Sequence, residues 1–248
     1  RWGENTGFGR FFRFWGLSLC APLFSLTAIT FFYGLLAGTP YKWLNLAQLL
    51  AHIARVENPQ SSLASVDYFT SSVKPELATR GIVSKEAQDA YVRALKANQV
   101  TVHYGRPQLE RANAPRFISK KINASRQDTV AIWKLEEKET DVHIAISMYR
   151  VASRQEMLPW GDRVEQLVLM SGDTDMAPAL RAVREDFPHL RIGIVLPYRT
   201  GSKRLAPGSL KEHAHWMRRV VTCDELQAHQ FPNRVPTHKA PAIKPDYW

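Results

Sequence analysis

The chain has 248 residues, of which 45% are hydrophobic and 10% aromatic, and this composition excludes a chain without a folded core. Its two cysteines, Cys20 and Cys223, are too few and too far apart for a disulfide framework, so a reducing, cytoplasmic setting is expected. The formal net charge of +10 excludes an acidic protein and favours polyanionic partners.

The N-terminal part contains a long uncharged segment, from Phe14 to Tyr41. Its length would allow a membrane anchor through residues 14–38, with Arg10 and Arg13 before it as in a signal-peptide flank. Pro22 interrupts the segment, however, and Leu26 to Phe31 has the composition of a buried strand. We therefore expect an N-terminal extension over residues 1–24 and the first strand immediately after it, with the membrane anchor as the alternative.

Helical and strand patterns then alternate along the chain, which is typical of βαβ units and of a mostly parallel sheet. The basic segment 105–131 has no clear period and is expected to be a loop. The pattern predicts an α/β domain over residues 25–197 and a basic helix with a Pro-rich tail over residues 198–248. In chain order, the expected elements are a helix at 43–56, a strand at 65–70, a helix at 84–97, a strand at 99–104, a helix from Asp141, a strand at 165–170, a helix at 177–187, a strand at 190–196 and a helix at 209–221.

The sharpest chemical signal is Ser171-Gly172-Asp173-Thr174-Asp175, which follows an apolar strand and opens a helix. Ligands of open α/β sheets gather at the carboxyl ends of the strands. Two carboxylates two residues apart at such a turn can face one site, and Mg²⁺ or Mn²⁺ prefers oxygen ligands of this kind. A plain helix N-cap would explain one of the two acids but not both.

A second acidic signal is Glu136-Glu137-Lys138-Glu139-Thr140-Asp141, which leads into a helix. Asp141 stands at the helix start, where it could cap the helix or reach the same site as Asp173. Glu136 and Glu137 are expected to face solvent.

Positive charge is concentrated in two stretches. Seven basic residues and two acids lie between Gly105 and Lys134, and nine basic residues and four acids lie between Tyr198 and Trp248. Arg116, Lys120 and Lys121 are candidates for binding the phosphates of RNA, although a solvated basic face is the simpler interpretation. A zinc site built from Cys223 with His213, His215 and His229 would need a spacing that matches no strong ligand pattern.

Several motifs resemble those of bacterial NYN-domain proteins, a family with the PIN-like nuclease fold. The likeness extends from about Phe32 to Trp248. The segments that carry it are Phe32-Tyr33-Gly34-Leu35-Leu36, Gly38-Thr39-Pro40-Tyr41-Lys42-Trp43-Leu44, Tyr68-Phe69-Thr70, Glu136-Glu137-Lys138, Asp141-Val142, Ile144-Ala145, Ser171-Gly172-Asp173-Thr174-Asp175-Met176, Pro178-Ala179-Leu180 and Lys244-Pro245 with Trp248.

The resemblance implies a PIN-like three-layer fold and a ribonuclease that uses Mg²⁺ or Mn²⁺. Asp141, Asp173 and Asp175 would be its catalytic and metal-binding residues. The family's first strand ends in Asp-Gly-x-Asn, whereas this chain has Thr27 and Thr30 at the acid and amide positions. A hydroxyl does not replace an anionic ligand, so the activity would be impaired. The alternatives are a non-catalytic RNA-binding or interaction module on the same fold and a phosphatase of the haloacid dehalogenase type, for which no early Asp-x-Asp pair is present.

Overall fold

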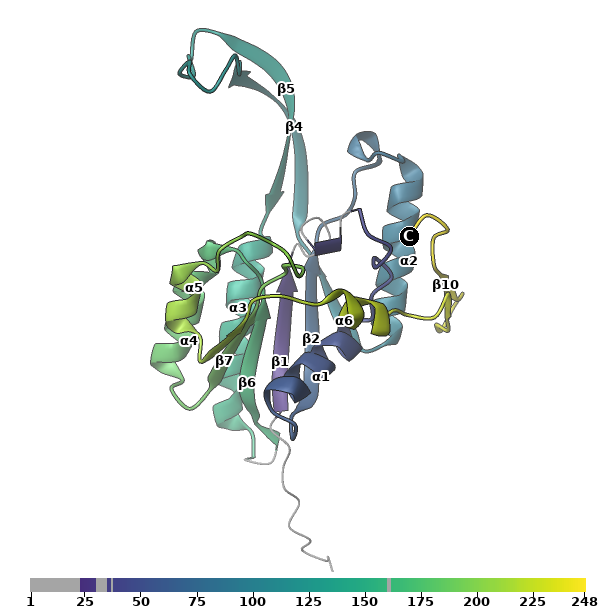
Figure 1. Cartoon of the computed structure of the whole chain (residues 1–248), viewed down its shortest axis with the longest axis vertical. Helices are drawn as coiled ribbons and strands as arrows, with labels where there is room; N and C mark the ends of the chain where they lie inside the picture. Colours follow the sequence, from purple (N-terminus) through teal and green to yellow (C-terminus); the bar gives the residue numbers. More distant parts are fainter. Residues whose placement is uncertain (1–22, 30–34, 37, 160–161) are drawn as a thin grey trace, which may run out of the picture.

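A computed structural model describes residues 23–29, 35–36, 38–159 and 162–248 of the chain. Its centre is a six-stranded sheet in which every neighbouring pair is parallel (Figure 1). The strand order is β3-β2-β1-β6-β7-β8. The strands are β1 (Leu23–Ile29), β2 (Ser62–Thr70), β3 (Val100–Tyr104), β6 (Val164–Met170), β7 (Arg191–Val195) and β8 (Trp216–Arg218).

Helices flank this sheet on both faces, because the central strand β6 carries apolar side chains in both directions. On β6, Val168 and Met170 belong to one buried cluster, whereas Leu167 and Leu169 belong to the other. The first cluster includes α1 (Leu46–Glu57), α2 (Ile82–Ala97) and α6 (Cys223–Ala228). The second includes α3 (Thr140–Arg154), α4 (Ala177–Asp186) and α5 (Gly208–His213).

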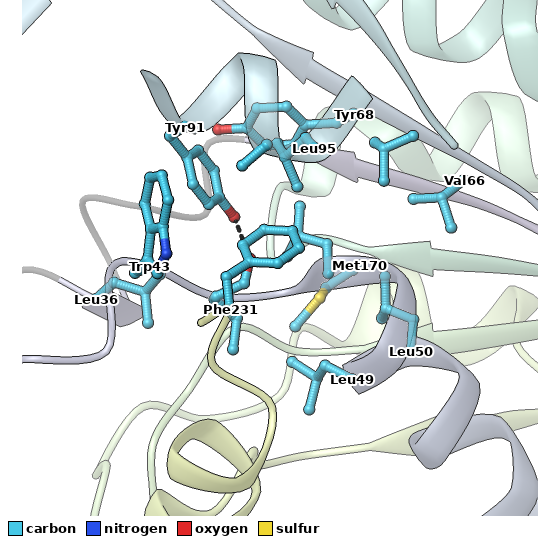
Figure 2. Packing of buried hydrophobic residues seen from close by; sticks show 14 of the residues in the cluster. Leu36, Trp43, Leu49, Leu50, Val66, Tyr68, Tyr91, Leu95, Met170 and Phe231 are labelled. Carbon is cyan, nitrogen blue, oxygen red and sulfur yellow. Dashed lines mark hydrogen bonds between the residues drawn. The ribbon is translucent and has the colours of Figure 1, made fainter. Parts of the chain in front are cut away.

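The first cluster is closed by aromatic rings from distant parts of the chain. The ring centroids of Trp43 lie 6.0 Å from Tyr91 and 5.9 Å from Phe231, and the Tyr91 hydroxyl donates a 2.8 Å hydrogen bond to the carbonyl of Leu44 (Figure 2). The Trp248 ring also packs against Trp43, with centroids 6.2 Å apart. These contacts attach the C-terminal segment, including β9 (Arg234–Val235) and β10 (Ala242–Ile243), to the core.

The expectation of a loop over residues 105–131 holds only for residues 116–128 and is wrong for the rest. This part of the chain contains β4 (Arg106–Pro115), which pairs antiparallel with β5 (Thr129–Lys138) over ten residue pairs. The two strands form an arm that projects from the sheet (Figure 1). No residue of either strand is fully buried, so neither strand has the buried apolar face by which half-buried strands are identified.

The helix expected over residues 209–221 is also too long, because α5 ends at His213 and the chain continues into β8. The backbone explains the change. His215 donates its N–H to the carbonyl of Ile192, and its Nδ1 accepts the N–H of Ile192, both at 2.8 Å. Pairing with β7 therefore replaces helical hydrogen bonds beyond Ala214.

The uncharged N-terminal segment is described only in part. Residues 23–29 form β1, which confirms a strand there, and the rest of the predicted extension and of the 14–34 stretch lies outside the described residues. Among the helices in the described parts of the chain, none has the length and apolar character needed to cross a bilayer.

Candidate metal centre

The candidate site lies where the direction of the sheet connections reverses. From β1 the chain adds β2 and β3 on one side, and then returns to place β6 on the other side of β1. In open α/β sheets, this switch point leaves a crevice outside the carboxyl ends of the two strands. The loop after β6 and the start of α3, which packs against β1, β2 and β6, both lie at this edge.

The loop after β6 is held by its own side chains. The hydroxyl of Ser171, which is buried, accepts the N–H of Asp173 at 3.0 Å. Asp173 Oδ1 in turn accepts the N–H of Asp175 at 3.0 Å and caps the short 3₁₀ helix Thr174–Met176. One oxygen of Asp173 is thus used locally, whereas the Asp175 side chain is exposed beside it. The capping interpretation applies to Asp173 and leaves Asp175 unexplained.

The start of α3 is fixed by the base of the arm. Glu139 has a left-handed backbone with a φ of 77°, and Asp141 lies in the first helical turn. The Thr140 hydroxyl donates a 2.5 Å hydrogen bond to Glu137 at the end of β5. Gly105, between β3 and β4, lies against this pair, because a Cβ at that position would stand 2.0 Å from Thr140 Oγ1. These contacts fix the start of α3 and therefore the position of Asp141 at the site.

Asp141, Asp173 and Asp175 come together in the structure, as each offers a carboxylate oxygen and these atoms lie within 4.8 Å of one another. The pKa of Asp141 is raised, first by partial burial and then by the negative charges of Asp173, Asp175 and Glu137. The carboxylates at this site therefore repel one another, and a bound cation would relieve that repulsion.

Oxygen-only ligands suit a hard divalent cation such as Mg²⁺ or Mn²⁺ better than zinc or copper, which prefer nitrogen and sulfur. The group is also the one cluster of three acids, histidines or cysteines in the described residues with spacing suited to a metal ion. The proposed zinc ligands do not form a cluster of this kind among the described residues. Nδ1 of His215 accepts the backbone N–H of Ile192, and Nδ1 of His229 lies 2.7 Å from the carbonyl oxygen of Glu225.

The remaining predicted residues lie elsewhere. Arg116, Lys120 and Lys121 belong to the segment that joins β4 to β5 at the end of the arm, and Arg116 forms an ion pair with Asp128 at 3.1 Å. Their RNA-binding role stays a prediction. The backbone of Thr27 pairs with Asp67 and Leu169 near the carboxyl end of β1, and Thr30 lies outside the described residues.

Sequence reasoning missed two contributors to this edge of the sheet. Glu137 is exposed, as expected, but it also accepts the Thr140 hydrogen bond and helps to raise the pKa of Asp141. Its place four residues before Asp141 was the available signal. The loop after β7 was not considered either, although Tyr198 reaches Gly172: a Cβ on Gly172 would stand 3.1 Å from the Tyr198 hydroxyl.

Comparison with known proteins gives one informative relative. The chain is 34% identical over 239 residues to a Pseudomonas putida protein named 6-hydroxy-3-succinoylpyridine 3-monooxygenase HspA, covering 88% of this chain and 72% of the relative. No protein-family profile matches the chain. A solved Vibrio parahaemolyticus protein of unknown function covers 84% of this chain and 97% of its own, with 11% identity and a TM-score of 0.42.

The relative corrects the functional prediction. A ribonuclease was expected from the acidic motifs and their resemblance to NYN-domain proteins, and this is wrong because the relative that matches most of the chain is named as a monooxygenase. The alternative of a non-catalytic module is corrected in the same way, whereas RNA binding by the basic residues stays a prediction. The same correction applies to the expectation of nuclease and hydrolase activity. The physical reason is that a cluster of carboxylates specifies which ion is bound and leaves open the reaction in which that ion takes part.

Proposed function

Because this chain belongs to the family of the 6-hydroxy-3-succinoylpyridine 3-monooxygenase HspA of Pseudomonas putida, we propose that it is an oxidative enzyme of the monooxygenase type. The observation that carries the proposal is the sequence likeness to that enzyme along most of both chains. In such a reaction one atom of O₂ enters the organic substrate and the other leaves as water. The two electrons come from a reduced co-substrate, for which a reduced nicotinamide is the chemical class that we propose.

The proposed reaction centre is the cluster of Asp141, Asp173 and Asp175, which would hold Mg²⁺ or Mn²⁺ through carboxylate oxygens. A cation bound there supplies Lewis acidity towards a carbonyl or hydroxyl oxygen of the substrate, and Mn²⁺ can also change its oxidation state. The protein's part is to fix the ligands: Ser171 orients Asp173, and Thr140 with Glu137 orients the start of α3. The raised pKa of Asp141 means that this carboxyl group takes up a proton more readily than an ordinary aspartate.

A flavin, the cofactor class that a monooxygenase name suggests, does not fit the described residues at this edge. The N–H of Asp175, which a phosphate would need at the helix start, already binds Asp173. The sequence also contains no Gly-x-Gly-x-x-Gly motif. We therefore derive no step through a flavin.

For the fold, we propose the finer PIN-like three-layer arrangement, and we propose that the likeness to NYN-domain proteins concerns fold and acidic residues. The parallel sheet with helices on both faces supports the first point. The carboxylates of the two resembling acidic motifs, which lie at one edge of that sheet, support the second.

Oxygen uptake tests the proposed function. The purified chain, supplied with Mn²⁺, a reduced nicotinamide and 6-hydroxy-3-succinoylpyridine, should consume O₂ only when the organic substrate is present. Asp173→Asn should lower the rate at least about a hundredfold, as expected for loss of a metal ligand. The matched control is Asp162→Asn, because Asp162 is exposed just before β6, at the opposite end of that strand. Uptake no higher than without enzyme, in a folded protein, would overturn the proposal.

A further inference from the structure

A groove lies beside the acidic cluster, in the loop that follows β7. It measures about 370 Å³, within the range of about 300–1,000 Å³ that is typical of small-molecule sites. Its walls are mostly polar or charged. They consist of Pro197, Tyr198, Arg199, Thr200, Gly201, Ser202 and Arg204, with Cys223 at the start of α6.

Tyr198 connects this groove to the acidic cluster. Its hydroxyl reaches Gly172, the residue directly before Asp173, so closely that a Cβ on Gly172 would stand 3.1 Å away. The strands that carry the two loops, β6 and β7, are neighbours in the sheet and run parallel. The groove and the carboxylates therefore open at the same edge, separated by the Gly172–Tyr198 contact.

The groove carries positive charge from two arginines, Arg199 and Arg204. Among the described residues, no acidic side chain forms an ion pair with Arg199 or Arg204. The Arg204 guanidinium lies 5.8 Å from the centroid of the Tyr198 ring. Arginine binds carboxylates through paired, charge-assisted hydrogen bonds, and a tyrosine ring offers an apolar face to an aromatic ring.

We propose that this groove binds the carboxylate of an anionic aromatic substrate. Arg199 and Arg204 hold the carboxylate, and Tyr198 packs against the ring. Held in this way, the ring's polar substituent faces the acidic cluster. The inference rests on the proposed function and names the substrate class for that same site. The arginines also offset the repulsion that the three aspartates exert on an anion.

Binding of two matched probes tests the groove. One is 6-hydroxy-3-succinoylpyridine, whose succinoyl chain ends in a carboxylate, and the other is its methyl ester, which keeps the ring and loses the charge. Isothermal titration of the full chain with Mn²⁺, but without a reductant, measures binding without turnover. The variants are Arg199→Gln and Arg204→Gln. The matched control is Arg150→Gln, because Arg150 is exposed on α3, about 13 Å along the helix from Asp141.

The wild-type protein should bind the acid about tenfold more tightly than the ester, and each groove variant should lose most of that preference while Arg150→Gln keeps it. Affinity for the ester should change less than twofold. Equal binding of acid and ester by the wild type, no binding of either probe, or an equal loss in Arg150→Gln would overturn the groove.

The same titrations separate this inference from the proposed function. An acid preference that depends on Arg199 and Arg204, in a protein that consumes no O₂, would support the groove and sink the oxidation. If the protein consumes O₂ but its groove variants keep the preference for the acid, the proposed oxidation would be supported and the groove overturned. Melting temperatures within about 2 °C of the wild type would show that the variants are folded.

Discussion

Asp141 and Asp173 come from different structural elements, and yet the negative charge of Asp173 makes the ionisation of Asp141 more costly. Asp141 enters from the first turn of α3, which begins at the base of the arm, and Asp173 enters from the loop after β6. The negative charge of Asp173 is the largest single-residue contribution to the raised pKa of Asp141, second only to burial. The fold therefore holds like charges close together, and no ion pair of the described residues involves either aspartate.

Metal ions should stabilise the protein. At a Mn²⁺ concentration about 100 times the dissociation constant, mass action predicts about 2.7 kcal/mol of additional stability. Thermal unfolding with Mn²⁺ and with a chelator measures this difference. Asp173→Asn should remove most of the Mn²⁺ effect and, by relieving repulsion, raise the melting temperature of the metal-free protein. A metal-free Asp173→Asn protein that melts below the metal-free wild type would count against the repulsion.

Metal affinity should depend on pH through Asp141. Its pKa is raised in the folded state, so protonation of Asp141 stabilises the metal-free fold at low pH, and this contribution is lost as the pH rises through the raised pKa. Binding of Mn²⁺ requires the ionised carboxylate and should strengthen over the same interval. Titrations between pH 4 and pH 7 measure both effects. In Asp141→Asn, the pH dependence of metal-free stability should shrink over that interval; an unchanged dependence would assign it to another group.

Gly105 should matter to the metal site without touching the metal. In Gly105→Ala, the new methyl group would overlap Thr140 Oγ1, displace the start of α3 and move Asp141. We expect a cost of about 1–3 kcal/mol in urea unfolding and weaker Mn²⁺ binding. Gly208→Ala is the matched control, because a Cβ there meets no atom within 4 Å and the change should be neutral or slightly stabilising. Wild-type Mn²⁺ affinity in Gly105→Ala would show that α3 is positioned by other contacts.

The central α/β fold could be predicted from sequence because its buried parts have clear periods. The run Leu167 to Met170 is apolar on both faces and predicted a buried strand, and the leucines of α1 repeat at helical spacing. The arm could not be predicted in the same way. Arg106–Pro115 and Thr129–Lys138 are stabilised by their mutual backbone pairing, and neither strand has a fully buried side chain to mark a face.

The acidic site could be predicted in part from the sequence for a similar reason. Asp173 and Asp175 follow a recognisable strand, and the parallel sheet brings the start of α3, and with it Asp141, to the same edge. The contribution of Glu137 depends on a hydrogen bond to Thr140 at the end of the unpredicted arm. The reaction was predicted wrongly, because three carboxylates indicate which kind of ion can bind but not which substrate reacts. We propose that Arg199 and Arg204 select the substrate.

The most direct test of the account is the fate of oxygen in the product. The enzyme should be incubated with Mn²⁺, a reduced nicotinamide and 6-hydroxy-3-succinoylpyridine under ¹⁸O₂ in ordinary water, and the product analysed by mass spectrometry. A monooxygenase predicts a product that carries a single ¹⁸O atom and gains none when the label is in the water instead. A product labelled only from water, or no product from a folded, Mn²⁺-bound protein, would contradict the account.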